Sequence, residues 1–71
     1  MKPDPITITA NGKREHLDST CSVAEFIETH GWKTTQVVIE RNGIVLPRNE
    51  LTTQMLLDGD CLEVIMPVAG G

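Results

Sequence analysis

Residues 6–27, ITITANGKREHLDSTCSVAEFI, carry the signals of a strand, a hairpin turn, a second strand and a helix in direct succession. Residues 6–9 alternate apolar and β-branched polar side chains, which is the period of a half-buried strand. Asn11-Gly12 is a strong hairpin signal, because both residues tolerate the positive φ of a type I′ turn. Residues 13–17 are polar enough to return as an edge strand, where two basic side chains discourage further pairing.

The helix of this stretch is predicted from its first turn. Ser22 and Glu25 have the spacing of a capping box, in which each side chain bonds the backbone N–H of the other residue. The apolar residues of 23–27 then fall on one stripe of the helix, with His30 at the end of that stripe. Gly31 supplies the left-handed conformation at which we expect the helix to end.

Three further strands are predicted in the second half of the chain. Residues 37–41 have a strand pattern closed by a second Asn-Gly turn, and residues 44–46 return until Pro47 removes a backbone donor. A polar connector over residues 49–55 and a tight Asp-Gly-Asp turn at 58–60 precede the last strand.

The last strand, residues 61–66, is apolar on both faces. Such a strand suits a central position, here beside Ile6 and Ile8, better than an edge. The order β-β-α-β-β-β predicts an α+β fold, a mixed sheet of about five strands packed on one main helix. We expect residues 1–67 to form this domain and residues 68–71, which have no periodicity, to form a C-terminal tail.

Size and charge limit the possible functions. The chain has 71 residues and a formal net charge of −4. One small core is expected, which favours a binding or carrier module over a self-sufficient enzyme. The acidic balance argues against a nucleic-acid partner, because no basic stripe can neutralise phosphates. The sequence contains no signal peptide or membrane-spanning run, so we expect a cytoplasmic protein without a membrane partner. Neither end resembles a purification tag, so we expect Gly71 to be the natural terminus.

The cysteines, histidines and tryptophan have spacings that favour structural roles. Cys21 and Cys61 match no zinc spacing, and we expect reduced, buried thiols, with a persulfide role as the alternative. His16 and His30 lack companion ligands and a nucleophile, so edge-strand and helix-end roles are expected. Trp32 is expected to cover the end of the core. No metal site is predicted.

Four segments of the chain share a pattern with one known family. They are the helix start at 22–27, NGIVLPR at 42–48, LDGD at 57–60 and the ending VAGG at 68–71. Together they resemble the ThiS family, the sulfur carriers of thiamine biosynthesis, over nearly the whole chain. Ala69 stands where the family often has a third glycine, and Leu51 where it often has an aromatic residue. These departures leave open the small subunit of molybdopterin synthase, which shares the fold and the Gly-Gly end.

The resemblance implies a β-grasp (ubiquitin-like) fold and a carrier whose working group is the carboxylate of Gly71. It implies that a ubiquitin-activating-type adenylyltransferase adenylates this carboxylate with ATP and Mg²⁺, neither of which this chain binds itself. A persulfide from a cysteine desulfurase or another donor would then produce a thiocarboxylate, whose sulfur enters the thiazole ring on thiazole synthase. The chain is therefore expected to be a co-substrate without a catalytic residue, a cofactor or a metal of its own.

The tail also fits this chemistry on physical grounds. Glycine has no Cβ, so Gly70 and Gly71 can enter a channel too narrow for a side chain, with Ala69 and Val68 behind them. Four residues beyond Pro67 reach roughly 13 Å at about 3.3 Å each. At neutral pH the terminal carboxylate is an anion and a poor acyl electrophile, so it must be activated before sulfur attacks it.

A partner surface is predicted near the end of the last strand. Ile65 and Met66 are expected to frame a surface for the activating enzyme. Arg48 is a further candidate contact, with pairing to Glu50 or Asp58 as its alternative. A third interpretation of the chain is a β-grasp interaction module with an inert terminus, for which deletion of the two terminal glycines would change nothing.

Overall fold

The first half of the chain folds as the sequence predicts. In the computed structural model, which describes residues 4–67, β1 (Ile6–Ala10) and β2 (Lys13–Leu17) form an antiparallel hairpin. Asn11 and Gly12 have φ values of 51° and 79°, the positive values that a type I′ turn requires. β2 lies at one edge of the sheet, as its basic side chains indicated.

Helix α1 (Val23–Thr29) begins at the predicted capping box. The Ser22 hydroxyl accepts a hydrogen bond from the Glu25 N–H at 3.0 Å, and the Glu25 carboxylate accepts one from the Ser22 N–H at 3.0 Å. Gly31 follows with a φ of 79°, the left-handed conformation at which the helix ends. The 3₁₀ turn η1 (Thr34–Gln36) then leads back to the sheet.

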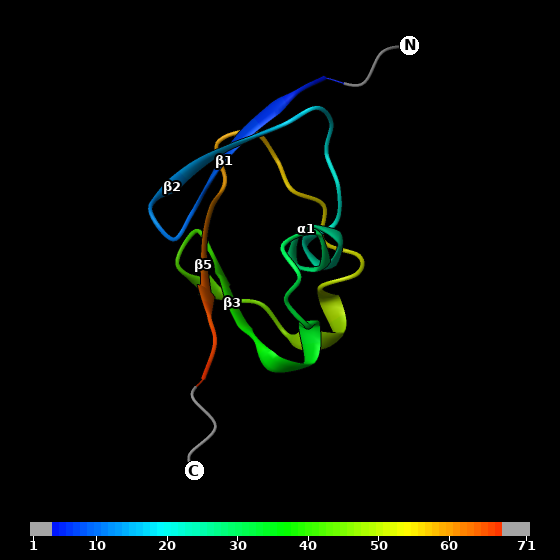
Figure 1. Ribbon diagram of the computed structural model, residues 1–71, viewed down its shortest axis with the longest axis vertical. Helices are drawn as coiled ribbons and strands as arrows, with labels where there is room; N and C mark the ends of the chain where they lie inside the picture. The colour runs from blue at the N-terminus through cyan, green and yellow to red at the C-terminus, as the bar shows by residue number, and fades with distance from the viewer. Residues whose placement is uncertain (1–3, 68–71) are drawn as a thin grey trace.

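The second half contributes the other three strands. β3 (Val38–Arg41) and β4 (Ile44–Val45) form a second hairpin, the 3₁₀ turn η2 (Arg48–Glu50) opens the connector, and β5 (Cys61–Ile65) follows. The strand order is β2-β1-β5-β3-β4, with β5 parallel to β1 and antiparallel to β3 (Figure 1). The predicted mixed sheet with a central last strand is therefore confirmed.

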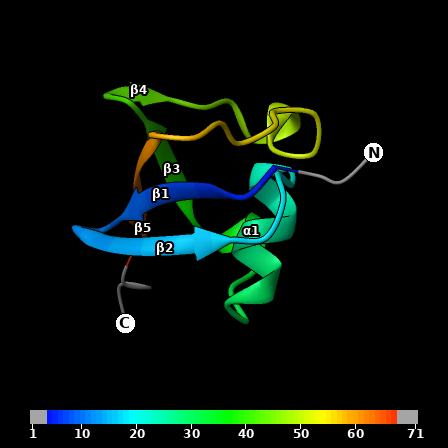
Figure 2. The ribbon, with the colours of Figure 1, turned by 90° about the horizontal axis from the view of Figure 1, so that it is seen from above.

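Helix α1 covers one face of the sheet (Figure 2). The core between them consists of buried apolar side chains from β1, α1, β3, β5 and the segments that connect them: Ile6, Ile8, Ala10, Val23, Ala24, Phe26, Ile27, Val37, Ile39, Leu51, Leu56, Leu62 and Val64. Burial of this apolar area is the main favourable contribution to folding. Within residues 4–67, no helix is both long and apolar enough to cross a membrane.

Two details of the last strand differ from the sequence analysis. β5 is buried on one face only, since its residues alternate between exposed and buried positions and α1 covers a single face. Its partners in β1 are Thr9 and Ala10, not Ile6 and Ile8. The central position of β5 therefore rests on backbone pairing with strands on both sides and on one apolar face, not on two.

Candidate functional site

The candidate site is the part of the domain that leads into the predicted tail. The tail residues themselves lie outside the described residues: Val68, Ala69, Gly70 and Gly71. They follow β5 after Met66 and Pro67, and β5 is held between β1 and β3. The tail therefore starts from the strand whose position is fixed by neighbours on both sides.

Two turn asparagines hold β5 from both sides. The Asn11 side chain accepts a hydrogen bond from the Val64 N–H at 2.7 Å and donates one to the Val64 carbonyl at 3.2 Å. On the other side, the Asn42 side chain accepts one from the Cys61 N–H at 2.9 Å. The Asn11 amide thus continues the ladder beyond the last residue of β1, and it keeps the backbone of Val64 paired. The sequence predicts only turn formation for both asparagines.

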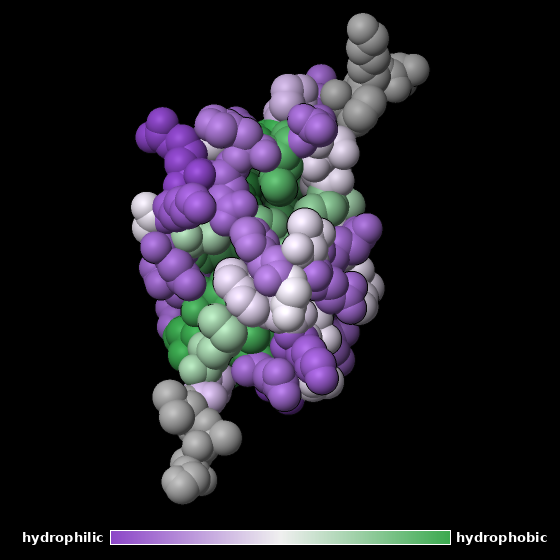
Figure 3. Space-filling model, viewed as in Figure 1, coloured by the Kyte–Doolittle hydropathy of each residue, from purple (hydrophilic) through white to green (hydrophobic). Residues whose placement is uncertain are grey.

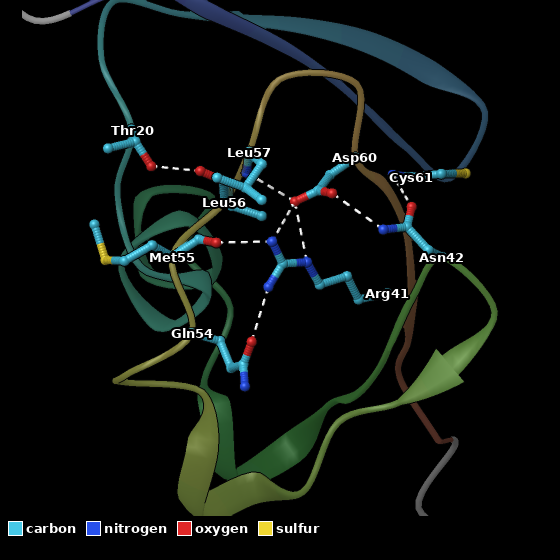
Figure 4. Close-up of polar contacts among 9 residues, drawn as sticks. All are labelled: Thr20, Arg41, Asn42, Gln54, Met55, Leu56, Leu57, Asp60 and Cys61. Carbon is cyan, nitrogen blue, oxygen red and sulfur yellow. Dashed lines mark hydrogen bonds and ion pairs between the residues drawn. The ribbon is translucent and has the colours of Figure 1, made fainter.

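A buried ion pair fixes the start of β5 (Figure 4). The Arg41 Nη2 and Asp60 Oδ2 atoms are 2.7 Å apart, and their side chains are only 14% and 7% exposed. The guanidinium also donates to the Gln54 side-chain oxygen and to the Met55 carbonyl, each at 2.8 Å. The Asp60 carboxylate accepts from the Leu57 N–H at 2.8 Å as well. This network ties the connector before β5 to the end of β3.

The environment of Asp60 favours the charged carboxylate. Burial raises the pKa of this carboxyl, but the net shift is downward. Hydrogen bonds from the Leu57 N–H, the Asn42 amide and Arg41, together with the charge of Arg41, outweigh the cost of burial. Asp60 is therefore a structural anion. From the sequence alone, Asp60 is only part of a turn, because the arginine that pairs with it lies 19 residues earlier in the chain.

The opposite face of the sheet carries five side chains that we call the outer-face patch: Val38, Glu40, Val45, Glu63 and Ile65. Val38 pairs directly with Ile65, and Glu40 lies between Glu63 on one side and Val45 on the other. Val45 is 56% exposed and Ile65 is 44% exposed. Within residues 4–67, no helix lies on this face (Figure 2). Figure 3 shows apolar surface over the part of the sheet where β3 and β5 approach the end of the described chain.

Met66 and Arg48 lie apart from Ile65. They line a surface hollow beside the root of the tail, by which we mean Met66 and Pro67. The hollow has a volume of about 540 Å³, and its lining includes Trp32, Lys33, Val37, Arg48, Met66 and Pro67. Arg48 donates to the Val37 carbonyl at 3.4 Å. Its alternative pairing with Glu50 or Asp58 is wrong, because neither carboxylate lies within ion-pair distance of it among the described residues. The structure thus divides the predicted surface between two neighbouring places.

The two cysteines differ in exposure. Cys21 is half-buried against the core. Burial, and secondarily the negative charge of Glu25, raise the pKa of the Cys21 thiol, which disfavours a reactive thiolate. Cys61 is exposed, contrary to the expectation, because it falls on the open phase of β5.

The histidines and the tryptophan lie near the edge strand and the helix end, as predicted. His30 stacks on Trp32 with ring centroids 4.7 Å apart and bonds Glu15 of β2 at 3.2 Å. His16 bonds Thr7 across the first hairpin at 2.9 Å. Trp32 packs at the margin of the core. Residues 4–67 contain no group of three or more side chains placed to hold a metal ion.

Comparisons with known proteins agree on one family. The model of the ThiS family matches residues 5–71. The crystal structure of the thiamine biosynthesis protein (ThiS) from Geobacter metallireducens is similar, with a TM-score of 0.79, 29% identity, and coverage of 93% of this chain and 100% of that chain. A solution structure of a thiamine biosynthesis protein from the same organism gives a TM-score of 0.76 and 29% identity, covering 93% and 88% of the two chains. No match was found among curated proteins. The fold is the β-grasp fold of these neighbours.

Proposed function

The chain belongs to the ThiS family, and on that premise we propose that it is a sulfur carrier of thiamine biosynthesis whose terminal Gly71 carboxylate carries the sulfur. The observation that supports this most is the continuity of the central strand β5 with the sequence Val-Ala-Gly-Gly. A β-grasp domain of this kind presents the tail from a fixed position. The crystal and solution structures described above are of a thiamine biosynthesis protein, which favours this pathway over molybdopterin synthesis.

The proposed chemistry begins with activation of the carboxylate, which is an anion at neutral pH. An oxygen of the Gly71 carboxylate attacks the α-phosphorus of ATP on an adenylyltransferase, and pyrophosphate leaves with the bridging oxygen. The glycyl adenylate is a good acyl donor, and the terminal sulfur of a partner's cysteine persulfide displaces AMP from it. A thiol then cleaves the resulting acyl disulfide, which yields the thiocarboxylate and a disulfide between the two thiols.

The domain's own part in this chemistry is recognition and delivery. Four residues beyond Pro67 span roughly 13 Å, which is enough to reach from the domain surface into a nucleotide pocket of the partner. Gly70 and Gly71 fit a narrow channel because they lack a Cβ. In this proposal the partners are a ubiquitin-activating-type adenylyltransferase, a persulfide donor such as a cysteine desulfurase, and thiazole synthase.

The outer-face patch is the proposed docking surface for the activating enzyme. It is exposed, it combines apolar and charged side chains, and its Ile65 lies two residues before Pro67. An enzyme that covers this face would therefore also hold the root of the tail. Met66 and Arg48, in the adjacent hollow, would contact the partner at the margin of the same interface.

Reconstitution of thiazole formation tests the proposed function. We expect the chain, together with an adenylyltransferase, a cysteine desulfurase and thiazole synthase, to support formation of the thiazole product. A variant that lacks Gly70 and Gly71 should bind the same partners and support none. Equal product from the truncated variant would instead favour the interaction module with an inert terminus. Activity only with a molybdopterin synthase large subunit would favour the other pathway.

A further inference from the structure

The outer-face patch contains two carboxylates placed side by side. Glu40 of β3 and Glu63 of β5 are direct partners in the antiparallel register of these two central strands. Side chains of directly opposite residues project from the same face with their Cβ atoms about 4.5–5.5 Å apart. Two negative charges at this separation repel each other, so the pair destabilises the sheet.

No cation in the described part of the chain compensates this pair. Within residues 4–67, the ion pairs join Arg41 to Asp60 and His30 to Glu15, and neither involves Glu40 or Glu63. On β4, the residue that pairs with Glu40 is Val45, which is apolar and exposed. Among the described residues, the acid pair is therefore left without a countercharge on an open face.

Apolar side chains flank the acid pair on two sides. Val38 and Ile65 form the next cross-strand pair toward the tail, and Val45 lies beyond Glu40 on β4. A partner that covers these apolar side chains would exclude water from the carboxylates between them. In such a place a countercharge is needed, because an unpaired buried charge is costly.

We propose that the Glu40 and Glu63 carboxylates together bind the guanidinium of one arginine on the activating enzyme, within the apolar rim of the outer-face patch. Arginine fits better than lysine, since its planar fork of donors can bond two carboxylates at once and is more weakly hydrated than an ammonium group. The proposal rests on the proposed function, because it names the chemistry by which the activating enzyme recognises this carrier.

The position of the pair relative to the terminus gives this contact a role in delivery. Gly71 lies eight positions after Glu63, a span of roughly 26 Å when the chain is extended at about 3.3 Å per residue. The arginine should therefore lie within that distance of the nucleotide pocket on the enzyme. An arginine at this place would fix where the tail enters the nucleotide pocket of the enzyme.

A charge-neutralising double variant tests the proposal. The adenylyltransferase from the organism that encodes this chain is assayed by ATP-dependent pyrophosphate release, with wild-type carrier, with Glu40→Gln/Glu63→Gln and with the matched control Asp18→Asn/Glu28→Gln. The control makes the same change in net charge at exposed positions outside the patch. We expect KM for the Glu40→Gln/Glu63→Gln carrier to rise about 10- to 100-fold, as for loss of charged hydrogen bonds. We expect kcat to stay within about twofold, because the tail is unchanged.

The partner side of the contact is tested by alanine substitution of the enzyme's surface arginines. Substitution of one of these arginines should raise KM for the wild-type carrier. The same substitution should cause no further rise in KM for the double variant, because the two changes remove the same interaction. Adenylation of the wild type with equal KM values for double variant and control would overturn the inference alone. Absence of any adenylation of the wild type would overturn the proposed function, and the inference with it. A thermal unfolding midpoint of the double variant that is no lower than that of the wild type excludes misfolding as the cause of a raised KM.

Discussion

Glu40 and Arg41 are neighbours in β3, yet their side chains meet opposite conditions on the two faces of the sheet. Arg41 lies on the helix side, where Asp60, Gln54 and the Met55 carbonyl accept its hydrogen bonds (Figure 4). Glu40 lies on the outer side, directly opposite Glu63. The charges that hold the fold together are fully compensated, whereas those on the open face are not. The charged groups on the helix side therefore stabilise the fold, whereas the outer side is the surface that we propose for a partner.

The largest expected effect follows from removal of the compensated cation. Arg41→Ala removes the ion-pair partner of the buried Asp60 carboxylate, which keeps its hydrogen bonds from Leu57 and Asn42, and should cost about 3 kcal/mol of unfolding free energy. That is a large share of the total, since a domain of this size has about 4–10 kcal/mol. Urea denaturation measures it, with Arg14→Ala on the exposed edge strand as the control. A loss equal to that of the control would remove the distinction between the two faces.

A smaller loss of unfolding free energy is expected when β5 loses its hydrogen bonds to the Asn11 side chain in the first turn. Asn11→Gly keeps a residue that tolerates the positive φ, but it removes both hydrogen bonds to the Val64 backbone. We expect a cost of about 2 kcal/mol, because the backbone groups lose their partner. Thermal unfolding measures the cost, and Asn49→Gly at an exposed position outside the sheet is the control. Unchanged stability would mean that β5 does not need this bond.

Low pH should lower the stability of the fold through Asp60, which lies on the helix side of the sheet. The pKa of Asp60 is lower in the folded protein than in the unfolded chain, so its contribution to stability is complete above the unfolded pKa of about 3.9. This contribution is lost as the pH falls from there through the folded pKa. Asp60→Asn should therefore be less stable than wild type at pH 7 and lose less stability as the pH falls below about 4. Parallel curves of unfolding free energy against pH would contradict this account of Asp60.

The smallest expected effect is an increase in the free energy of unfolding, whereas the other changes lower it. Glu40→Gln removes the repulsion with Glu63, and we expect the unfolding free energy to rise by about 0.2–1 kcal/mol. Glu63→Gln should give a similar rise, and the two together should be less than additive, because either change alone removes the repulsion. Glu28→Gln on the exposed side of α1 is the control. A decrease on neutralisation of Glu40 would mean that the acid pair serves the fold itself.

Local signals predicted the fold because they act over a few residues. The two Asn-Gly turns and the capping box of Ser22 and Glu25 appear in the structure where the sequence places them. The network around Arg41 and Asp60 could not be found in this way, since the two residues come together only when β3 and β5 pair. The exposure of Cys61 was missed for the same reason. Its phase in β5 decides its exposure, and the sequence does not fix which phase faces the helix.

The candidate site was predicted in part. The sequence predicts that Ile65 and Met66 frame one partner surface, and the structure places Ile65 on the outer phase of β5 and Met66 just beyond the end of that strand. Ile65 belongs to the outer-face patch and Met66 to the hollow beside the tail root. The pairing of Glu40 with Glu63 depends on the register of two strands distant in sequence, and no local pattern contains it.

We propose that the Gly71 carboxylate is the working group of the domain. Intact-mass spectrometry after incubation with ATP, the adenylyltransferase and a persulfide donor tests it most directly. We predict a gain of about 16 Da, the exchange of one oxygen for sulfur, located by fragmentation in the peptide that ends at Gly71 and absent from a variant that lacks this residue. No gain, or a gain located at Cys21 or Cys61, would contradict the claim.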